Sequence, residues 1–123
     1  MKHRSLFAIM LAVTIAASAV TVLAHMKAAK MEPAADATLT APPTKVQIWF
    51  TQAPDPKVSR LALAGPNGAV KLKDFKVVAA DKSIVAMIDG AVGQGKFTAS
   101  WQAAGDDGHV QKGQYSFLVK VTH

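Results

Sequence analysis

Alternating apolar and polar residues run through most of the chain after residue 40 and predict short β-strands. The alternation is clearest in four runs, at residues 45–50, 83–88, 96–101 and 114–121. A period of two is expected where a strand buries one face and exposes the other. Two further runs, 59–64 and 69–72, flank Gly65-Pro66-Asn67-Gly68, a turn sequence that predicts a hairpin. We expect residues 25–39 to add one edge strand at most.

These strands, with no amphipathic helix among them, predict an all-β fold. We expect a Greek-key β-sandwich of about seven strands, immunoglobulin-like or cupredoxin-like in architecture. A closed β-barrel is the alternative. Phe97 and Trp101 are predicted to anchor the core, and Met87, which alternates with Val85, is predicted to fill it. One face of the last run carries four apolar side chains, Tyr115, Phe117, Val119 and Val121.

The start of the chain predicts a secretory signal helix. A short basic segment, Lys2-His3-Arg4, precedes apolar residues 6–20, and Val22-Leu23-Ala24 carries the small residues expected before a cleavage site. Cleavage after this tripeptide removes residues 1–24. It leaves residues 25–123 as one small domain.

Two other interpretations of this segment stay open. Ala17-Ser18-Ala19 also fits the cleavage rule, and a cut there starts the mature chain at Val20. Alternatively, the apolar stretch 6–23 remains attached as a membrane anchor, since its length is near the lower limit for spanning. Only the cut after Ala24 leaves a histidine, His25, at the new amino terminus.

Composition narrows the possible chemistry. The chain has no cysteine, which excludes disulfides, thiolate metal sites and cysteine nucleophiles. Removal of Lys2 and Arg4 with the signal reduces the 14 basic residues to 12, against 8 acidic ones. The remaining lysines are scattered, and Arg60 is the only arginine left, so we expect no binding to nucleic acid. With imidazole, amine, carboxylate and thioether donors, a bound metal is expected to be Cu(II), Zn or Ni.

An amino-terminal His25 has a particular chemistry. Its free α-amine and its ring Nδ1 can bind one metal ion in a six-membered chelate ring, which no internal histidine can do alone. An α-amine, with an ordinary pKa of about 8, loses its proton readily to a strong Lewis acid near neutral pH. A residue of some kind must follow any cleavage site, however, so His25 needs partners elsewhere in the chain.

Candidate partners lie between the last two predicted strands, in Asp107-Gly108-His109. Asp107 and His109 are two residues apart, so in extended backbone their side chains project to the same side, and the glycine between them permits a bend. With His25 they offer three nitrogens and one oxygen, a set that suits tetragonal Cu(II). The alternative is a plain polar turn. The chain has only two other histidines, His3 and His123.

Further segments place these residues in a characteristic order along the chain. Ala24-His25 is followed by a strand that ends in Trp49-Phe50-Thr51. Phe97-Thr98-Ala99-Ser100-Trp101 then leads into Asp107-Gly108-His109 and the last strand, which contains Gly113-Gln114-Tyr115-Ser116-Phe117. This order resembles the CopC/PcoC family of periplasmic copper-binding proteins over essentially the whole mature domain. The block from tryptophan to Asp-Gly-His is the most specific part of the resemblance.

The resemblance implies a copper-binding function. It implies that His25, Asp107 and His109 are ligands of Cu(II), and it favours cleavage after Ala24. It also implies a monomeric periplasmic protein that serves copper resistance, storage or delivery to an inner-membrane copper transporter of the CopD type.

Several residues depart from the family pattern. Many relatives carry glutamate where Gln52 stands, which puts a supporting carboxylate in doubt. The methionine-rich loop that some relatives use for Cu(I) is missing, because the mature chain has only Met26, Met31 and Met87. Met26 and Met31 are the candidate thioether donors to Cu(I). We expect His123 to be a solvated terminus.

We do not expect an enzyme. The sequence offers no nucleophile–base pair, and Asp106 and Asp107 point to opposite faces of an extended strand. Two alternatives remain: an oxidative copper enzyme with a histidine brace, as in lytic polysaccharide monooxygenases, or a metal-free β-sandwich interaction module. Turnover driven by ascorbate or peroxide distinguishes the first, and metal titration distinguishes the second.

Overall fold

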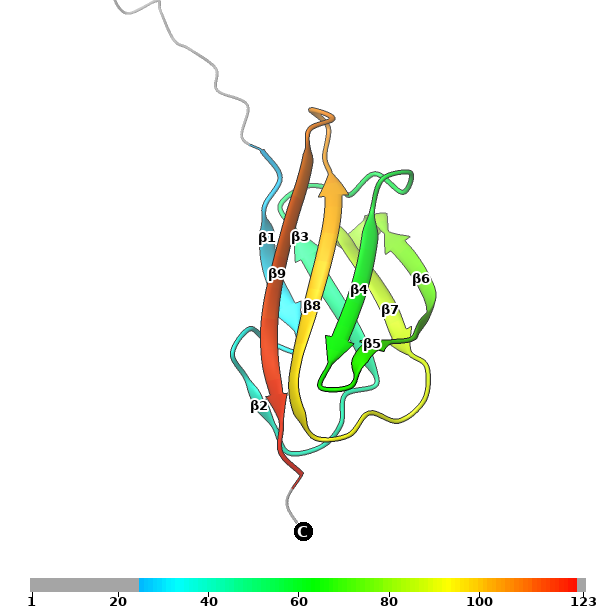
Figure 1. Cartoon of the computed structure of the whole chain (residues 1–123). Coiled ribbons are helices and arrows are strands. Elements are labelled where there is room, and N and C mark those ends of the chain that lie inside the picture. The colour runs from blue at the N-terminus through cyan, green and yellow to red at the C-terminus, as the bar shows by residue number, and fades with distance from the viewer. Residues whose placement is uncertain (1–24, 122–123) are drawn as a thin grey trace, which may run out of the picture.

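The computed structural model describes residues 25–121 as a β-sandwich in which two sheets pack face to face (Figure 1). One sheet has the order β1-β3-β7-β6, formed by Ala28–Glu32, Lys45–Phe50, Ser83–Ile88 and Leu72–Val78. The other has the order β2-β9-β8-β4-β5, formed by Thr38–Leu39, Val110–Val119, Gly95–Ala104, Arg60–Gly65 and Gly68–Val70. All strand pairs are antiparallel except β2–β9. The predicted all-β sandwich is confirmed.

Helical structure is minimal in this part of the chain. A 3₁₀ turn at Ala79–Asp81 is the only helical element between residues 25 and 121. No helix there is long and apolar enough to cross a membrane. The predicted signal segment 1–24 and the terminal His123 lie outside the described residues.

Two parts of the strand pattern differ from the sequence-based expectation. Residues 25–39 were expected to give one edge strand at most, but they contain both β1 and β2, which lie at the edges of different sheets. Strand β6 has no counterpart among the predicted strands because a bulge interrupts its alternation. Its register with β7 shifts between Lys73 and Lys76, and Asp74 between them has a positive φ of 55°.

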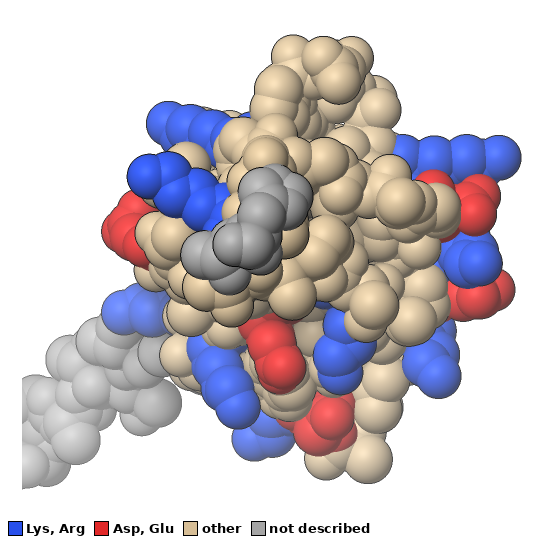
Figure 2. All heavy atoms as spheres, turned by 90° about the horizontal axis from the view of Figure 1, so that it is seen from below, with Lys and Arg blue, Asp and Glu red and all other residues tan. Residues whose placement is uncertain are grey.

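Charged side chains on the surface are mixed in sign. Figure 2 shows the end of the sandwich near the carboxyl terminus, where basic and acidic residues lie interspersed around the edge of the face. Lys71 and Lys73 both approach the Asp89 carboxylate, at 3.7 and 3.8 Å. Such alternation of sign is typical of a solvated surface.

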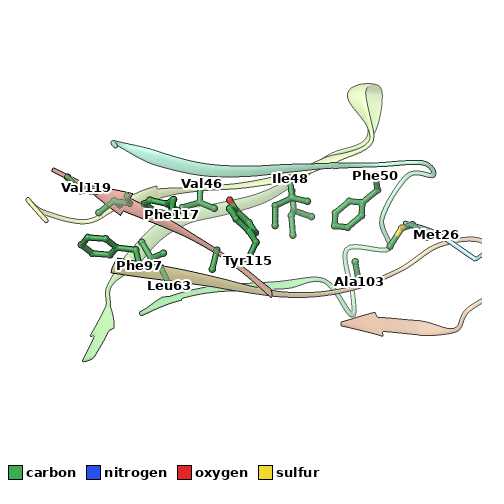
Figure 3. Close-up of a cluster of buried hydrophobic side chains, with 13 residues drawn as sticks. Met26, Val46, Ile48, Phe50, Leu63, Phe97, Ala103, Tyr115, Phe117 and Val119 are labelled. Atoms are coloured by element: carbon green, nitrogen blue, oxygen red, sulfur yellow. The ribbon is translucent and has the colours of Figure 1, made fainter. Parts of the chain in front are cut away.

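The core lies between the two sheets and is filled by alternate residues of β3, β7, β8 and β9 (Figure 3). Phe97 and Phe117 stack with ring centroids 5.7 Å apart, and Tyr115 and Val119 are buried on the same face of β9. These positions confirm the predicted role of Phe97 and the predicted apolar face of the last strand as far as Val119. Val121 lies after the end of β9 and is partly buried against the core.

Two core predictions need correction. Trp101 is only partly buried: it packs against the rim of the core, where its ring meets Phe50 edge to face at 5.0 Å. Met87 was expected to fill the core, which is wrong, because 37% of its surface is exposed. Ile84, Ala86 and Ile88 take the inward positions of β7, so Met87 lies on the outer face of its sheet.

Three segments distant in sequence meet at the upper end of the sandwich in Figure 1. The β8–β9 hairpin pairs continuously from Gly95 opposite Val119 to Ala104 opposite Val110, and it presents the 105–109 loop at its tip. Strand β1 pairs with β3, with Ala28 opposite Phe50, which brings the residues before β1 beside those that follow β3. The fold therefore places the start of the described chain next to this loop.

Candidate metal centre

The three side chains predicted to bind metal come together at this end of the sandwich. His25 Nδ1 lies 2.6 Å from Asp107 Oδ2, and His109 Nδ1 lies 3.7 Å from the same oxygen. The two imidazole rings have centroids 5.0 Å apart. One potential ligand atom from each residue lies within 4.8 Å of the others. A single metal ion can therefore contact all three residues.

A tight turn brings Asp107 and His109 to the same side. Asp107 Oδ1 accepts a hydrogen bond from the His109 backbone N–H at 3.0 Å, and the Gly108 N–H donates to the Gly105 carbonyl at 3.1 Å. Gly108 has a φ of 75°, a left-handed conformation that glycine adopts without strain. The sequence argument assumed extended backbone here, but the shared side results from an Asx-type turn.

Asp107 is the shielded member of the site. Its side chain is 13% exposed, whereas those of His25 and His109 are 52% and 69% exposed. The hydrogen bond from the His109 backbone N–H, followed by the one to the His25 side chain, lowers the pKa of Asp107 below its usual value. An aspartate is ionised at neutral pH, and the lowered pKa keeps the Asp107 carboxylate negatively charged to a lower pH than usual.

The end of β3 holds the segment that carries His25. The Thr51 N–H donates to the Lys27 carbonyl at 2.9 Å, and Thr51 Oγ1 accepts from the Lys27 N–H at 3.0 Å. Met26, between His25 and Lys27 in the sequence, is 2% exposed and belongs to the core cluster. Figure 3 shows its side chain beside Phe50 and Ala103, at the end of the row of core residues.

Gln52 supports the loop that carries Asp107. Its side-chain Oε1 accepts a hydrogen bond from the Asp106 backbone N–H at 3.0 Å. Sequence reasoning noted Gln52 only as a replacement for glutamate and gave no role to Thr51. Neither role has a local signal in the sequence, because each depends on a partner brought near by the fold.

The donor set fits a borderline transition metal. Two exposed imidazoles and one carboxylate are poor ligands for calcium or magnesium, which prefer oxygen donors throughout, and are well suited to Cu(II), Zn or Ni. Met31 is partly buried against the core and Met26 is fully buried, so both candidate thioether donors pack into the protein interior.

Comparison with known proteins identifies the family of this chain. Residues 28–120 match the model of the CopC domain. Protein YobA of Escherichia coli K12 is 30% identical over 102 residues, which cover 81% of this chain and 82% of that protein. The structure also superposes on PcoC, a methionine-rich copper resistance protein from Escherichia coli, with a TM-score of 0.70 and 29% identity over 79% of this chain and all of PcoC. CopC from Methylosinus trichosporium OB3b shares the fold, with a TM-score of 0.72 at 21% identity over 80% of this chain and 97% of that one. The chain therefore belongs to the CopC domain family.

Proposed function

We propose that this protein is an exported Cu(II)-binding protein whose metal is held by His25, Asp107 and His109. The observation that carries the proposal is the convergence of both imidazoles on Asp107 Oδ2, although His25 is 82 residues away in the sequence. The similarity to PcoC, itself a copper resistance protein, favours copper over zinc or nickel as the bound metal.

Removal of the signal peptide completes the donor set in this proposal. Cleavage after Ala24 frees the α-amine of His25, which then binds copper together with the Nδ1 of the same residue. The amine, two imidazoles and the Asp107 carboxylate supply three nitrogens and one oxygen, which suits the equatorial plane of Cu(II).

A copper ion whose equatorial positions are filled by protein atoms is bound for transport rather than for catalysis. We therefore assign the protein to copper resistance, storage or delivery in the periplasm. It acts as a monomer and passes copper to an inner-membrane transporter of the CopD type. Copper is the cargo in this function.

The test compares two forms of the mature protein in a competition titration with Cu(II). One form begins at His25, and the other carries a single glycine before it. The added residue converts the α-amine to an amide, so we expect one tightly bound Cu(II) in the first form and much weaker binding in the second. Circular dichroism should show the same fold in both forms.

Equal affinity of the two forms would show that the amine is not a ligand. An intact mass of the exported protein that begins at Val20 would also contradict the proposal, because an internal His25 has no free amine. Oxidation of ascorbate or turnover of peroxide by the copper-loaded form would instead indicate an oxidative enzyme.

A further inference from the structure

We propose that Met26, Thr51 and Gln52 form a positioning layer beneath the metal site, which holds both donor-bearing segments in place before copper binds. None of the three residues is a metal ligand in this arrangement. The inference rests on the proposed Cu(II) site and deepens it by naming the residues that set its geometry.

Thr51 fixes the segment that carries His25. Its backbone N–H donates to the Lys27 carbonyl at 2.9 Å, and its hydroxyl oxygen accepts from the Lys27 N–H at 3.0 Å. Both hydrogen-bonding groups of the Lys27 backbone are therefore bonded to Thr51, directly after β3, and Lys27 is only two residues after His25. The chain before β1 is therefore tied to the sheet up to the residues next to the first metal donor.

Gln52 fixes the other segment. Its Oε1 accepts the Asp106 backbone N–H at 3.0 Å, immediately before Asp107. The loop backbone lies directly against this side chain, since a Cβ built on Gly105 would collide with Gln52 Oε1. Two consecutive residues after β3 thus hold the two halves of the site, which are otherwise distant in sequence.

Met26 joins the two segments from below. It follows His25 directly, and burial to 2% exposure restricts the path of the chain at that point. A Cβ built on Gly105 would lie 3.3 Å from Met26 Cβ, so the loop and the amino-terminal segment are in contact with each other. Figure 3 places Met26 among the core side chains and shows that the layer is continuous with the core.

The positioning layer matters because the donors themselves are exposed. His25 and His109 are 52% and 69% exposed, at the start of the domain and at the tip of a hairpin. Without support, copper binding would include the entropic cost of ordering both segments. The contacts made by Met26, Thr51 and Gln52 order both segments when the protein folds. They therefore raise copper affinity without touching the metal.

The test removes these contacts one at a time from the protein that begins at His25. Gln52→Leu and Thr51→Val keep the side-chain volume but lose the acceptor oxygen. We expect each to raise the dissociation constant for Cu(II) by about tenfold, the value of one lost hydrogen bond. Gln52→Glu and Thr51→Ser keep an acceptor and should bind Cu(II) at least nearly as tightly as the wild type.

Gln102→Leu is the matched control. Gln102 is another half-buried glutamine that bonds a backbone group, with Nε2 donating to the Val58 carbonyl at 3.0 Å. Its loss should lower the melting temperature to a similar degree and leave Cu(II) affinity unchanged. If Gln52→Leu and Gln102→Leu change the affinity equally, the effect is one of general stability and the positioning layer is refuted.

A measurement on the metal-free protein decides the inference independently of copper. We expect the amide order parameters of Asp107 and His109 to fall in Gln52→Leu and to remain high in Gln102→Leu. Wild-type order at both amides in Gln52→Leu would overturn the positioning layer even if copper binds as proposed. If the wild-type protein does not bind Cu(II) but the Gln52→Leu variant still shows this loss of order, the proposed function alone is refuted.

Discussion

Asp107 performs two separate tasks with its two carboxylate oxygens. Oδ1 accepts the His109 backbone N–H and closes the turn, while Oδ2 faces the imidazoles of His25 and His109. Because one oxygen is engaged with the backbone, the other has a fixed position even without a metal. In the proposed copper site the carboxylate is therefore the stationary donor, and the two more exposed imidazoles are the donors free to adjust.

Substitution of the loop ligands should reveal this difference. We expect His109→Ala to weaken Cu(II) binding more than Asp107→Ala, since imidazole is the better donor to Cu(II) and water can replace a carboxylate oxygen. Asp107→Asn, which keeps an oxygen able to accept the His109 N–H, separates loss of the turn from loss of charge. A competition titration measures all three. Wild-type affinity in both alanine variants would mean that the loop is only a turn.

Copper binding should also depend on pH in a way that identifies the imidazoles. The pKa of Asp107 is lowered by the His109 backbone N–H and then by the His25 side chain, so this carboxylate is protonated at a lower pH than an ordinary aspartate. Imidazoles have an ordinary pKa of about 6.5, and their protonated form cannot bind metal. We therefore expect Cu(II) affinity to fall as the pH drops from 7.5 to 5. An affinity that is constant down to pH 5 would exclude imidazole ligands.

The lowered pKa of Asp107 also determines how the stability of the metal-free protein depends on pH. A carboxyl group whose pKa is lower in the folded than in the unfolded protein stabilises the native state at any pH above the unfolded pKa. This stabilisation is lost as the pH falls through the folded pKa. The Asp107 contacts should thus weaken only in strong acid, below the range in which copper is released.

At the level of elements, strands with uninterrupted alternation could be predicted and irregular ones could not. Strand β7 spans Ser83–Ile88, the range predicted from the pattern. Strand β8 extends beyond the predicted end at Trp101 to Ala104, where Ala103 and Ala104 are both buried and the alternation that marks a strand is lost. Strand β2 has two residues and is stabilised by its parallel neighbour β9, which no local pattern records.

The candidate site likewise has a part that could be predicted from the sequence and a part that could not. The grouping of His25, Asp107 and His109 could be predicted, because imidazole and carboxylate are recognisable metal donors and the order of the motifs resembles the CopC/PcoC family. The supporting roles of Thr51 and Gln52 could not, since they exist only where β3 ends beside the β8–β9 loop. These contacts belong to the fold rather than to a motif.

One glycine in β9 is expected to be essential for the packing of the hairpin. A Cβ on Gly113 would lie between 2.5 and 2.7 Å from atoms of the Trp101 indole, which covers this position from β8. Gly113→Ala should destabilise the protein by about 1–3 kcal/mol, the usual cost of overpacking. Gly93→Ala is the control, because its Cβ would have no neighbour within 4 Å. Chemical denaturation measures both, and equal stability would show that the indole can move aside.

At the scale of the whole molecule, the nitrogen and oxygen donors gather in one place, whereas the methionines are packed into or spread over the sandwich. The imidazoles and the carboxylate gather at the end where the chain begins. Met26 is buried in the core, Met31 is partly buried in β1, and Met87 lies on an outer face opposite Lys45 at the far end of β3. PcoC is by contrast a methionine-rich protein. The three methionines of this domain are dispersed, so they do not form a common thioether site.

This arrangement of donors predicts the redox preference of the protein. Cu(I) favours soft sulfur donors, whereas Cu(II) favours nitrogen and oxygen in a tetragonal plane. We expect one Cu(II) to bind tightly and Cu(I) to bind much more weakly, so that reduction of the loaded protein labilises the metal. Titration with each oxidation state measures this, with Cu(I) held anaerobically against a competing chelator. A second Cu(I) site of comparable strength would contradict the prediction, and Met26→Leu and Met31→Leu would then show which thioether leaves its packed position to bind the metal.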